Sequence, residues 1–397
     1  MHLLRCDVVV VGAGPSGSMA ARVAAEQGAT VILLEEHPHV GLPISCAEGL
    51  CVNALKAAGV DPTPEIVCQR ITKTRFYTPN GKHLELASTD WTGYSIKRDA
   101  FDRVLSEKAV EAGAELMTGT KVTEVLTRDG VVSGVLARRG GEVLRIEARV
   151  VIGADGWAST VRRTAGLGRL FPDFAICAQY RLGNLSLDEP EMNEFHFGSK
   201  VAPGAFAYVF PKSGEVANVG LGVRRIHREP PIAYLKRFVE YDPRLKEAEI
   251  QRVSGGIIPA SGVIDNVVTD GVMLVGDAAG QLIPLTGAGV HTGIVAGRIA
   301  GEVAARAAHE GEVSASRLSE YDRRFDAIWG KQIRDSRRVG EMLDRFNDDG
   351  LNRIAEVLTS KDVLALANGI NITRVLAGAA MRSPLKFMRL VTSYLRG

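Results

Sequence analysis

The sequence has few of the features that would assign it to a specialised class of protein. Lysine and arginine (48) nearly balance aspartate and glutamate (46), which leaves a formal net charge of +2 over 397 residues. Nucleic-acid-binding domains carry a strongly basic surface, so we expect no nucleic-acid partner. No run of about 18 apolar residues occurs, and we expect no membrane-spanning helix. The first apolar run leads directly into a glycine-rich turn, so we expect no signal peptide.

Cysteine is scarce and irregularly spaced. The five cysteines are Cys6, Cys46, Cys51, Cys68 and Cys177. An odd number at these spacings fits neither a disulfide framework nor a CxxC zinc site, so we predict no metal. A disulfide between Cys46 and Cys51 is sterically conceivable but not expected, because free thiols are typical of a reducing compartment. We therefore expect a cytoplasmic protein.

Near the N-terminus, "DVVVVGAGPSGSMAARVAAE" contains a strand, a glycine-rich turn and a helix in that order. The four consecutive valines at 8–11 are typical of a strand buried on both faces, and the segment after the turn is alanine-rich with helical spacing. Gly12, Gly14 and Gly17 form a GxGxxG turn, whose missing side chains let backbone N–H groups approach a pyrophosphate. This pattern predicts a dinucleotide-binding site.

An acidic residue follows the next predicted strand, "TVILL". Glu35 stands about 20 residues beyond the glycine-rich turn, where a carboxylate can accept a hydrogen bond from a ribose hydroxyl. Glu36 is the competing acid. We favour Glu35 because it directly closes the apolar run.

Two later segments again place an Asp at the end of an apolar strand. These are "VVIGADGWASTVRR", with Asp155, and "GVMLVGDAAG", with Asp277. Beyond the second segment, Gly287 and Gly289 precede a long predicted helix. The alternative interpretation of both aspartates is N-capping of the helices that follow them.

Taken in this order, the three motifs resemble those of the flavoprotein family typified by para-hydroxybenzoate hydroxylase. The resemblance implies an α/β fold with a Rossmann-like FAD-binding domain of the GR2 type, and FAD as the cofactor. It also implies that the helix opening at Gly289 directs its N–H groups and positive dipole end at the flavin, which stabilises the anionic reduced flavin. Arg98 matches an arginine of the family that contacts the FAD; a solvated surface arginine is the alternative.

The residues implied to bind FAD are Gly12, Gly14, Ser16, Gly17, Glu35, Cys46, Ala47, Arg98, Asp155, Gly156, Asp277, Ala278, Gly287, Gly289 and Val290. No second GxGxxG unit occurs. An electron donor must therefore bind transiently, and the sequence leaves open whether it is NAD(P)H or a reduced ferredoxin.

Between about 165 and 265 the pattern changes to short alternating strands, which predict an antiparallel β-sheet cap domain over the FAD-binding domain. Beyond it the chain reads as a C-terminal helical region. The predicted boundaries are 1–75, 96–165 and 266–335 for the FAD-binding domain, 76–95 and 166–265 for the cap, and 336–397 for the helical region.

One strand of the cap is rich in aromatic residues. In "PGAFAYVFP", Phe206, Tyr208 and Phe210 share one face at period two, and Pro211 closes the strand. The face is either an aromatic wall for an apolar substrate or part of an ordinary packed core.

Two segments narrow the resemblance to the geranylgeranyl reductases. "PGAFAYVFP" is similar to their P-x-x-[YF]-x-[WY]-x-FP motif, and "GLPISCAEGL" (41–50) to their P-x-x-C-x-E-G-L motif. The sequence departs from the family by carrying Tyr208 where tryptophan is common and His291 where a small residue is frequent. The substrate pocket expected from the resemblance contains Phe206, Tyr208, Phe210, Pro284 and His291.

The resemblance implies reduction of double bonds in a geranylgeranyl chain by FAD, with a prenylated archaeal-type ether lipid precursor as the expected substrate. Menaquinone and chlorophyll-pathway prenyl chains are the alternatives within the family. Two other functions stay open: an aromatic monooxygenase of the same superfamily, and a non-catalytic prenyl-binding protein like the Rab escort proteins.

Cys46 stands in the second of these motifs. An isolated alkene is not polarised by a carbonyl, so hydride transfer to one carbon requires a proton for the other. We hypothesise that Cys46 supplies or positions this proton, with Glu48 shaping the loop and Tyr208 contributing from the cap. The alternative is that Cys46 is only a small buried apolar residue.

The last stretch, 371–397, has five basic residues and no acidic one, interleaved with leucine, phenylalanine and methionine. Such a pattern fits a helix lying on an anionic membrane surface. A solvated helix packed on its own domain is the alternative.

Overall fold

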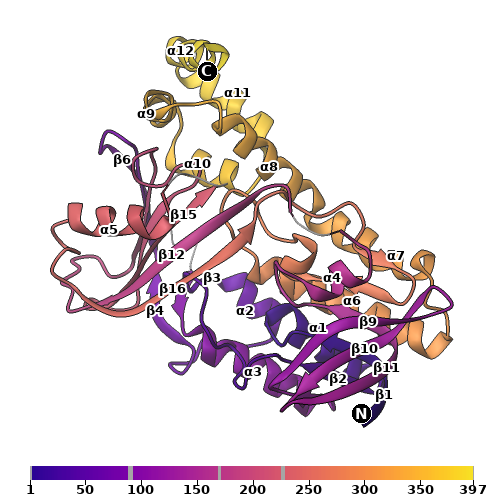
Figure 1. Cartoon of the computed structure of the whole chain (residues 1–397). Helices are drawn as coiled ribbons and strands as arrows, with labels where there is room; N and C mark the ends of the chain where they lie inside the picture. The colour runs from indigo at the N-terminus through magenta and orange to yellow at the C-terminus, as the bar shows by residue number, and fades with distance from the viewer. Residues whose placement is uncertain (1, 88–92, 169–170, 225–228, 397) are drawn as a thin grey trace.

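The computed structural model describes residues 2–87, 93–168, 171–224 and 229–396. It consists of a helix-covered sheet that contains the N-terminus, a second sheet beside it, and a set of helices at the end of the chain (Figure 1). This arrangement agrees with the predicted α/β fold with a cap and a C-terminal helical region.

The larger sheet has eight strands in the order β17-β18-β11-β1-β2-β8, with β10 and β9 continuing from β11. The strands β2, β1, β11 and β18 run parallel to one another. The bounds are β1 (His2–Val11), β2 (Val31–Leu34), β8 (Glu115–Met117), β9 (Thr120–Arg128), β10 (Val131–Arg139), β11 (Glu142–Gly153), β17 (Val268–Thr269) and β18 (Val272–Leu274). The valines at 8–10 are completely buried, as expected of a central parallel strand.

The parallel pairing aligns the three predicted motifs. Gly12 follows β1, Asp155 follows β11 and Asp277 follows β18, and these strands are neighbours in the sheet. Because the carboxyl ends of adjacent parallel strands meet at one edge, the motifs form one continuous site although they are far apart in the sequence.

Two helices pack against each other through glycine on one face of this sheet. They are α1 (Pro15–Glu26) and the 21-residue α6 (Val290–Glu310). A Cβ added to Gly297 would lie 2.1 Å from the carbonyl oxygen of Ser16, and one added to Gly301 would lie 2.5 Å from that of Ala20. The helix backbones are therefore in direct contact, and no larger side chain fits between them.

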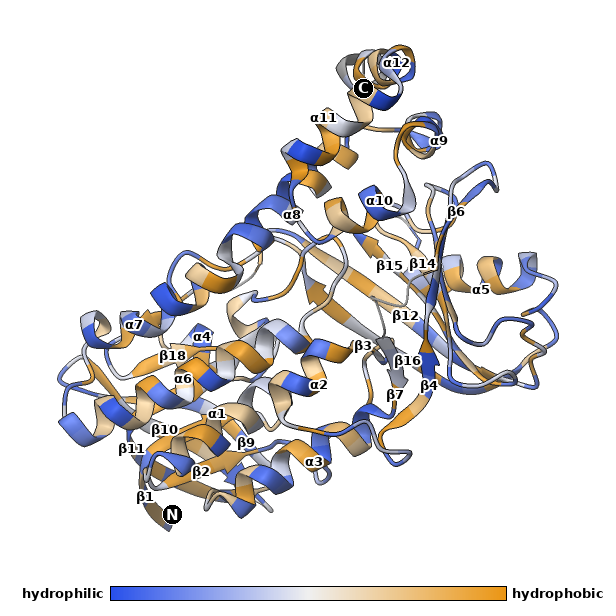
Figure 2. Cartoon of the chain, turned by 180° about the vertical axis from the view of Figure 1, so that it is seen from behind, coloured by the Kyte–Doolittle hydropathy of each residue, from blue (hydrophilic) through white to orange (hydrophobic). Residues whose placement is uncertain are grey.

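The remaining helices of this part cover the sheet and its edges, and apolar strands lie enclosed among them (Figure 2). They are α2 (Val52–Ala58), α3 (Arg98–Glu111), α4 (Thr160–Thr164), the short helix η1 (Gly276–Ala279) and α7 (Ala315–Phe325).

The second sheet has seven strands in the order β16-β12-β15-β14-β13-β5-β6 and corresponds to the predicted cap. Its bounds are β5 (Lys73–Tyr77), β6 (His83–Ala87), β12 (Phe174–Gly183), β13 (Met192–His196), β14 (Ala207–Pro211), β15 (Ala217–Arg224) and β16 (Glu249–Pro259), with α5 (Pro231–Tyr241) packed on one face. The pairing is antiparallel except between β13 and β5, which is parallel.

The predicted boundary between residues 75 and 76 is wrong, because it falls inside β5. Lys73 to Tyr77 pair along their whole length with β13, more than a hundred residues later in the chain. The cap therefore begins before Lys73, and only this long-range pairing reveals it.

A third, three-stranded sheet that the sequence did not predict lies between the two large ones. It consists of β3 (Gly49–Cys51), β7 (Gly93–Ile96) and β4 (Val67–Ile71). The predicted boundary between 95 and 96 cuts β7. Since β3 begins directly after Cys46 and Glu48, this sheet carries the loop that holds both residues.

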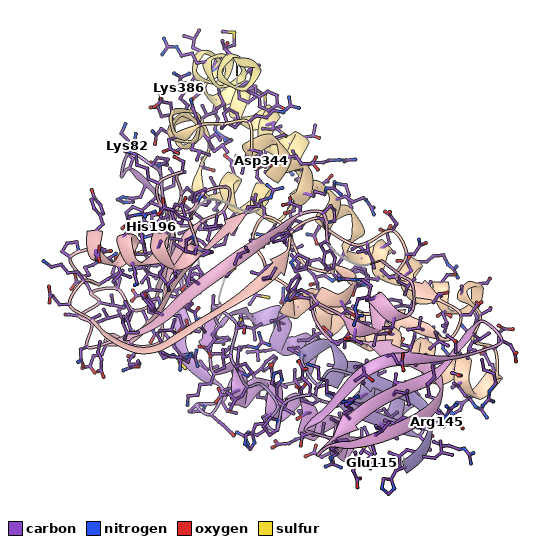
Figure 3. The ribbon with its side chains drawn as sticks, viewed as in Figure 1. Lys82, Glu115, Arg145, His196, Asp344 and Lys386 are labelled. Carbon is purple, nitrogen blue, oxygen red and sulfur yellow. The ribbon has the colours of Figure 1, made fainter. Side chains whose placement is uncertain are left out.

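The C-terminal helices extend away from the large sheet (Figure 1). After the π-helical turn η2 (Asp326–Gly330) come α8 (Lys331–Leu343), α9 (Asp348–Val357), α10 (Ser360–Ala367), α11 (Ile372–Arg382) and α12 (Pro384–Arg396). At the end of α8, Asp344 pairs with Arg224 of the cap at 2.8 Å (Figure 3). In the parts of the chain that the structure describes, every helix is too short or too polar to span a bilayer.

The contact between α1 and α6 predicts opposite effects for two Gly→Ala substitutions. Gly297→Ala should lower the free energy of unfolding by about 2 kcal/mol or more, because the new methyl group overlaps backbone atoms that cannot move independently. In α8, a Cβ on Gly340 would lie 3.8 Å from its nearest neighbour, so Gly340→Ala should be neutral or stabilise by up to about 1 kcal/mol. Urea denaturation of both variants measures these changes. An equal change in the free energy of unfolding for Gly297→Ala and Gly340→Ala would contradict the close contact between α1 and α6.

Candidate active site

The glycine-rich turn after β1 is in backbone contact with the turn after β11. Gly12 has φ +100°, and a Cβ there would lie 2.5 Å from the carbonyl oxygen of Ala154. A Cβ on Gly276, after β18, would similarly lie 2.5 Å from the hydroxyl of Ser16. The three motifs therefore adjoin one another, and glycine is required at both contacts.

Two helices begin at this edge without a side-chain cap. The N-cap of α1 is Gly14 and that of α6 is Gly289, and neither helix start receives a side-chain hydrogen bond. A Cβ on Gly14 would meet nothing within 4 Å, so the space beside this turn is open. Free N–H groups at the positive ends of two helices fit the diphosphate and the electron-rich ring edge of FAD.

Glu35 directly follows β2 and lies beside the glycine-rich turn. Its Oε2 accepts a hydrogen bond from the N–H of Ala13 at 2.9 Å, and its Oε1 is 2.7 Å from Nδ1 of His37. Glu36 is about half exposed and pairs with Lys121 at the surface. The geometry thus favours Glu35 over Glu36 as the acid that faces a nucleotide.

The two aspartates differ in their surroundings. Both carboxylate oxygens of Asp155 are occupied: one accepts from the Ser159 hydroxyl, the other from the N–H of Val161 in α4 at 3.0 Å. These are the helix-capping bonds that the sequence left open as the alternative for Asp155. A ligand bound at the Asp155–Gly156 turn would therefore contact the backbone of the turn, because the carboxylate of Asp155 is already occupied.

Asp277 is half-buried, and its carboxylate accepts no hydrogen bond from the described residues. Burial raises the pKa of its carboxyl group, and the charge of Arg98 opposes that effect. One of its carboxylate oxygens would lie 3.2 Å from a Cβ on Gly289, so it stands at the start of α6. An unsatisfied carboxylate at this position fits the hydroxyl groups of a ribityl chain.

Arg162 was not expected at this site. Its guanidinium is buried, donates to the carbonyl oxygens of Ala278 at 3.0 Å and Trp157 at 2.8 Å, and lies 4.2 Å from the ring centre of Phe171. Arg162 therefore ties the second motif to the third. The only sequence signal was an arginine inside an apolar strand–turn–helix segment.

Glu48 is completely buried and surrounded by cationic and amide donors. Its Oε2 lies 3.0 Å from Nζ of Lys212 and accepts from Asn218 at 2.7 Å and from Arg181. Its Oε1 accepts from the backbone N–H of Arg98 at 3.0 Å. Burial by itself would raise the pKa of Glu48, but these donors outweigh it and hold the pKa below its usual value.

The backbone of Glu48 also adopts an uncommon conformation. Its φ is +68°, in the left-handed region that residues with a Cβ seldom occupy. Such a conformation persists only where the surroundings fix it, and here both carboxylate oxygens are held. The bonds to the side chain of Glu48 therefore help to hold this conformation of the loop.

Cys46 lies within the same network. Its sulfur accepts from the N–H of Glu48 at 3.2 Å and interacts with the guanidinium of Arg98, which is paired with Asp102. Gln179 of the cap donates to the carbonyl oxygen of Cys46 at 3.1 Å. These polar contacts differ from those of a small apolar core residue, and all five cysteines are free.

Two further contacts hold the loop of residues 46–48 in place. The amide of Asn218 donates to the carbonyl oxygen of Ala47 at 3.0 Å. Arg98 is largely buried, so the alternative of a solvated surface arginine is wrong. The loop of residues 46–48 is thus fixed on one side by the cap and on the other by the start of α3.

The aromatic strand lies against this loop. The rings of Tyr208 and Phe210 are 4.8 Å apart, and a Cβ on Gly49 would lie 3.0 Å from Phe210. The hydroxyl of Tyr208 donates to Gln179 at 2.7 Å, and burial raises the pKa of Tyr208 well above its usual value. Phe206 continues the group, with its ring 6.5 Å from that of Tyr208.

Two further residues predicted for the substrate pocket lie at the start of α6 and just before it. The ring of His291, in the first turn of α6, lies 3.9 Å from the sulfur of Cys51 and 5.1 Å from Trp329. Pro284 is half-buried in the segment before α6. These contacts of His291 are therefore to the end of β3 and to η2, and burial lowers the pKa of His291.

Comparison with known proteins places this arrangement in a family. The family described as "FAD binding domain" matches residues 5–335. The digeranylgeranylglycerophospholipid reductase of Methanothrix thermoacetophila is 42% identical over 367 residues, which cover 91% of this chain and 93% of that protein. Digeranylgeranylglycerophospholipid reductase 2 of Methanopyrus kandleri is 39% identical, with 95% and 96% coverage. The chain belongs to this reductase family.

Solved structures agree with the assignment. A geranylgeranyl bacteriochlorophyll reductase-like protein of Thermoplasma acidophilum superposes with a TM-score of 0.88 at 30% identity, covering 98% of this chain and 100% of that one. The flavin-dependent brominase Bmp2 gives a TM-score of 0.73 at 18% identity, which shows a shared fold only.

Several residues that contact the loop of residues 46–48 were missed from the sequence. Lys212 and Asn218 hold Glu48, and Gln179 and Arg181 reach the same loop from β12. Gln179, Arg181 and Asn218 are polar residues in largely buried cap strands and Lys212 directly follows one, which is the signal that could have identified them. Among the described residues, no group of three or more His, Cys, Asp or Glu side chains is arranged to hold a metal ion.

The buried Glu48 predicts a pH-dependent loss of stability. Glu48→Gln should lower the free energy of unfolding at neutral pH by about 3 kcal/mol, because it leaves buried cations without a counter-charge. The folded-state pKa is depressed, so the contribution of Glu48 is fully present above the unfolded-state pKa of about 4.3 and is lost as the pH falls through the folded-state pKa.

The difference in the free energy of unfolding between wild type and Glu48→Gln, measured by urea denaturation, should therefore shrink below about pH 4.3. Glu36→Gln, which removes a surface carboxylate paired with Lys121, is the control and should cost less than about 1 kcal/mol. The same loss for Glu48→Gln at all pH values would show that its charge is not the stabilising feature.

Proposed function

We propose that the protein is an FAD-dependent reductase that saturates carbon–carbon double bonds in the geranylgeranyl chains of an archaeal-type glycerophospholipid precursor. The reductases of M. thermoacetophila and M. kandleri are its relatives over almost the whole length of the chain. The observation that carries the proposal is the packing of the Cys46 segment on the cap: Gly49 meets Phe210 of the aromatic strand, and Gln179, which accepts from Tyr208, donates to the carbonyl oxygen of Cys46. This packing joins an acid–base group to an apolar surface.

The residues of the sheet edge would hold the cofactor. Gly12, Gly14 and the start of α1 would receive the diphosphate, Glu35 the adenosine ribose, and Asp277 with the start of α6 the flavin end. When bound and reduced, FAD supplies a hydride, which carries two electrons. Since no second dinucleotide motif occurs, the donor that reduces it must bind transiently, and either NAD(P)H or a reduced ferredoxin would suffice.

Cys46 would supply the proton that completes the reduction. One alkene carbon gains the hydride and the other gains the proton of the thiol, so the C=C bond becomes CH–CH and a thiolate remains. The N–H of Glu48, which donates to the sulfur, and the positive charge of Arg98 would stabilise that thiolate. Water then restores the thiol.

The cap would position the prenyl chain. Tyr208, Phe210 and Phe206 form an aromatic surface, and the Tyr208 hydroxyl is satisfied by Gln179 and so need not face the substrate. An apolar surface next to Cys46 excludes water from the reacting carbons. Tyr208 accordingly orients the chain through its ring and fixes the Cys46 loop through Gln179.

We further propose that α11 and α12 contact a membrane. Phe387 and Leu390 of α12 pack inward with Val339 and its neighbours. On the outside, Met381, Leu385 and Met388 are 80%, 70% and 58% exposed, beside exposed Lys386 and Arg389. Both apolar and basic residues therefore face outward, at the end of the molecule remote from the large sheet (Figures 2 and 3).

The reductase function predicts lipid-dependent oxidation of the flavin without oxygen. Protein reduced with dithionite, freed of excess reductant and mixed anaerobically with a digeranylgeranyl glycerophospholipid should recover the yellow absorbance of oxidised FAD. A protein that stays reduced until O₂ is admitted would favour the monooxygenase instead.

In the same assay, Cys46→Ala should slow reoxidation by roughly a hundredfold, the usual contribution of a positioned proton donor, with FAD content preserved. Cys177→Ala, a thiol on β12 outside the proposed chemistry, is the control. Unchanged kinetics in Cys46→Ala would remove its catalytic role.

The outward face of α12 predicts binding to anionic vesicles. Replacing Leu385 and Met388 together by serine should reduce cosedimentation with phosphatidylglycerol vesicles about tenfold or more, since both side chains would leave the lipid. Tyr241→Ser, which removes a 90% exposed aromatic ring on α5, is the control. Equal binding of both variants and wild type would exclude the membrane role.

A further inference from the structure

An open cleft lies between the loop after β2 and strand β16 of the cap. Its volume is about 440 Å³, which is within the range of small-molecule sites. The lining consists of His37, Pro38, His39, Leu42, Pro43 and Ile44 from the loop and of Arg252, Val253 and Ser254 from the strand. The cofactor motifs and the aromatic strand do not belong to this lining, so the proposed function leaves the cleft without a ligand.

The polar side chains of the lining are engaged outside the cleft. Nδ1 of His37 lies 2.7 Å from the carboxylate of Glu35. The Nε and Nη2 atoms of Arg252 are buried, and Nη2 lies 3.6 Å from Oε2 of Glu48. The guanidinium charge is therefore directed at a carboxylate inside the protein, and the cleft does not suit an anionic ligand.

Apolar side chains, by contrast, are exposed on both walls of the cleft. Leu42 is 43% exposed on the loop side, and Val253 is 60% exposed on the strand side. Pro43, next to Leu42, is exposed as well. Exposed apolar residues that gather in one groove are typical of a binding site, because covering them with hydrocarbon releases water. The chemistry of the lining thus favours a hydrocarbon chain.

The cleft adjoins the loop that carries Cys46. Ile44, at the end of the loop wall, stands two residues before Cys46. On the strand wall, the hydroxyl of Ser254 accepts from Gln179 at 3.3 Å, and Gln179 donates to the carbonyl oxygen of Cys46 at 3.1 Å. Both walls are therefore connected to the proposed proton donor by one or two residues.

We propose that this cleft holds the second prenyl chain of a two-chain lipid while the first chain reacts at Cys46. The inference rests on the proposed reductase function, whose substrate carries two geranylgeranyl chains on one glycerol. Because the two chains leave adjacent glycerol carbons, the chain that is not at Cys46 must lie close to the path of the other. The cleft would then favour two-chain prenyl lipids over single-chain ones.

Filling the cleft with tryptophan tests the assignment. With dithionite-reduced protein, Val253→Trp and Leu42→Trp should each lower kcat/KM for digeranylgeranylglyceryl phosphate about tenfold, since excluding roughly two CH₂ groups of the second chain costs that much binding. The value for geranylgeranylglyceryl phosphate, which has the same headgroup and one chain, should change little. Ile250→Trp, at a 50% exposed position of β16 outside the lining, is the matched control and should leave both values unchanged.

Three results in the cleft variants would overturn the assignment. Equal losses for the two lipids would show that the cleft does not recognise a second chain. Unchanged values for both lipids would show that the cleft is not used. A slower reduction of the flavin by NADPH, with the ratio of the two lipids unchanged, would assign the cleft to the electron donor.

Binding without chemistry separates this inference from the reductase function. Diphytanylglyceryl phosphate, whose two chains are already saturated, should slow amide hydrogen exchange in the segments 42–44 and 252–254 of the wild type. Phytanylglyceryl phosphate, with one chain, should not. If this difference is found but neither geranylgeranyl lipid is reduced, only the reductase proposal fails. Equal protection by both saturated lipids, or by neither, would contradict a site for the second chain.

Discussion

The active site depends on one buried carboxylate, that of Glu48, and on the donors that hold it. Lys212, Asn218 and Arg181 come from the cap, and the N–H of Arg98 comes from the start of α3. A charge buried in this way is tolerated only while its partners stay in place. Glu48 therefore fixes the cap against the cofactor-binding part, and it fixes Cys46 between them.

The rest of the site follows from two packing constraints. Parallel pairing of β1, β11 and β18 aligns the three motifs at one edge, and the glycine contact between α1 and α6 sets two uncapped helix starts beside it. The loop of residues 46–48 adds a group that can give up a proton, and the aromatic strand adds an apolar surface. In the proposed reaction, the cofactor and the prenyl chain would meet at Cys46.

Local signals predicted the cofactor edge well, because a strand, a glycine-rich turn and a helix are each encoded by adjacent residues. Gly12, Glu35 and Asp277 follow β1, β2 and β18, and Gly289 precedes α6, in agreement with the predicted elements. The partners of Glu48 could not be predicted, because they are brought together from positions 98, 181, 212 and 218 by sheet pairing. The same limit explains the misplaced start of the cap at β5 and the neighbours of His291, which come from β3 and η2.

The most direct test of the account is the mass of the lipid after reaction. Dithionite-reduced protein would be incubated without oxygen with a digeranylgeranyl glycerophospholipid, and the recovered chains weighed by mass spectrometry. The account predicts that the mass rises in steps of two hydrogen atoms, one step for each double bond reduced. A lipid recovered with unchanged mass from protein that contains FAD, with oxygen added to a second compound once air is admitted, would contradict it.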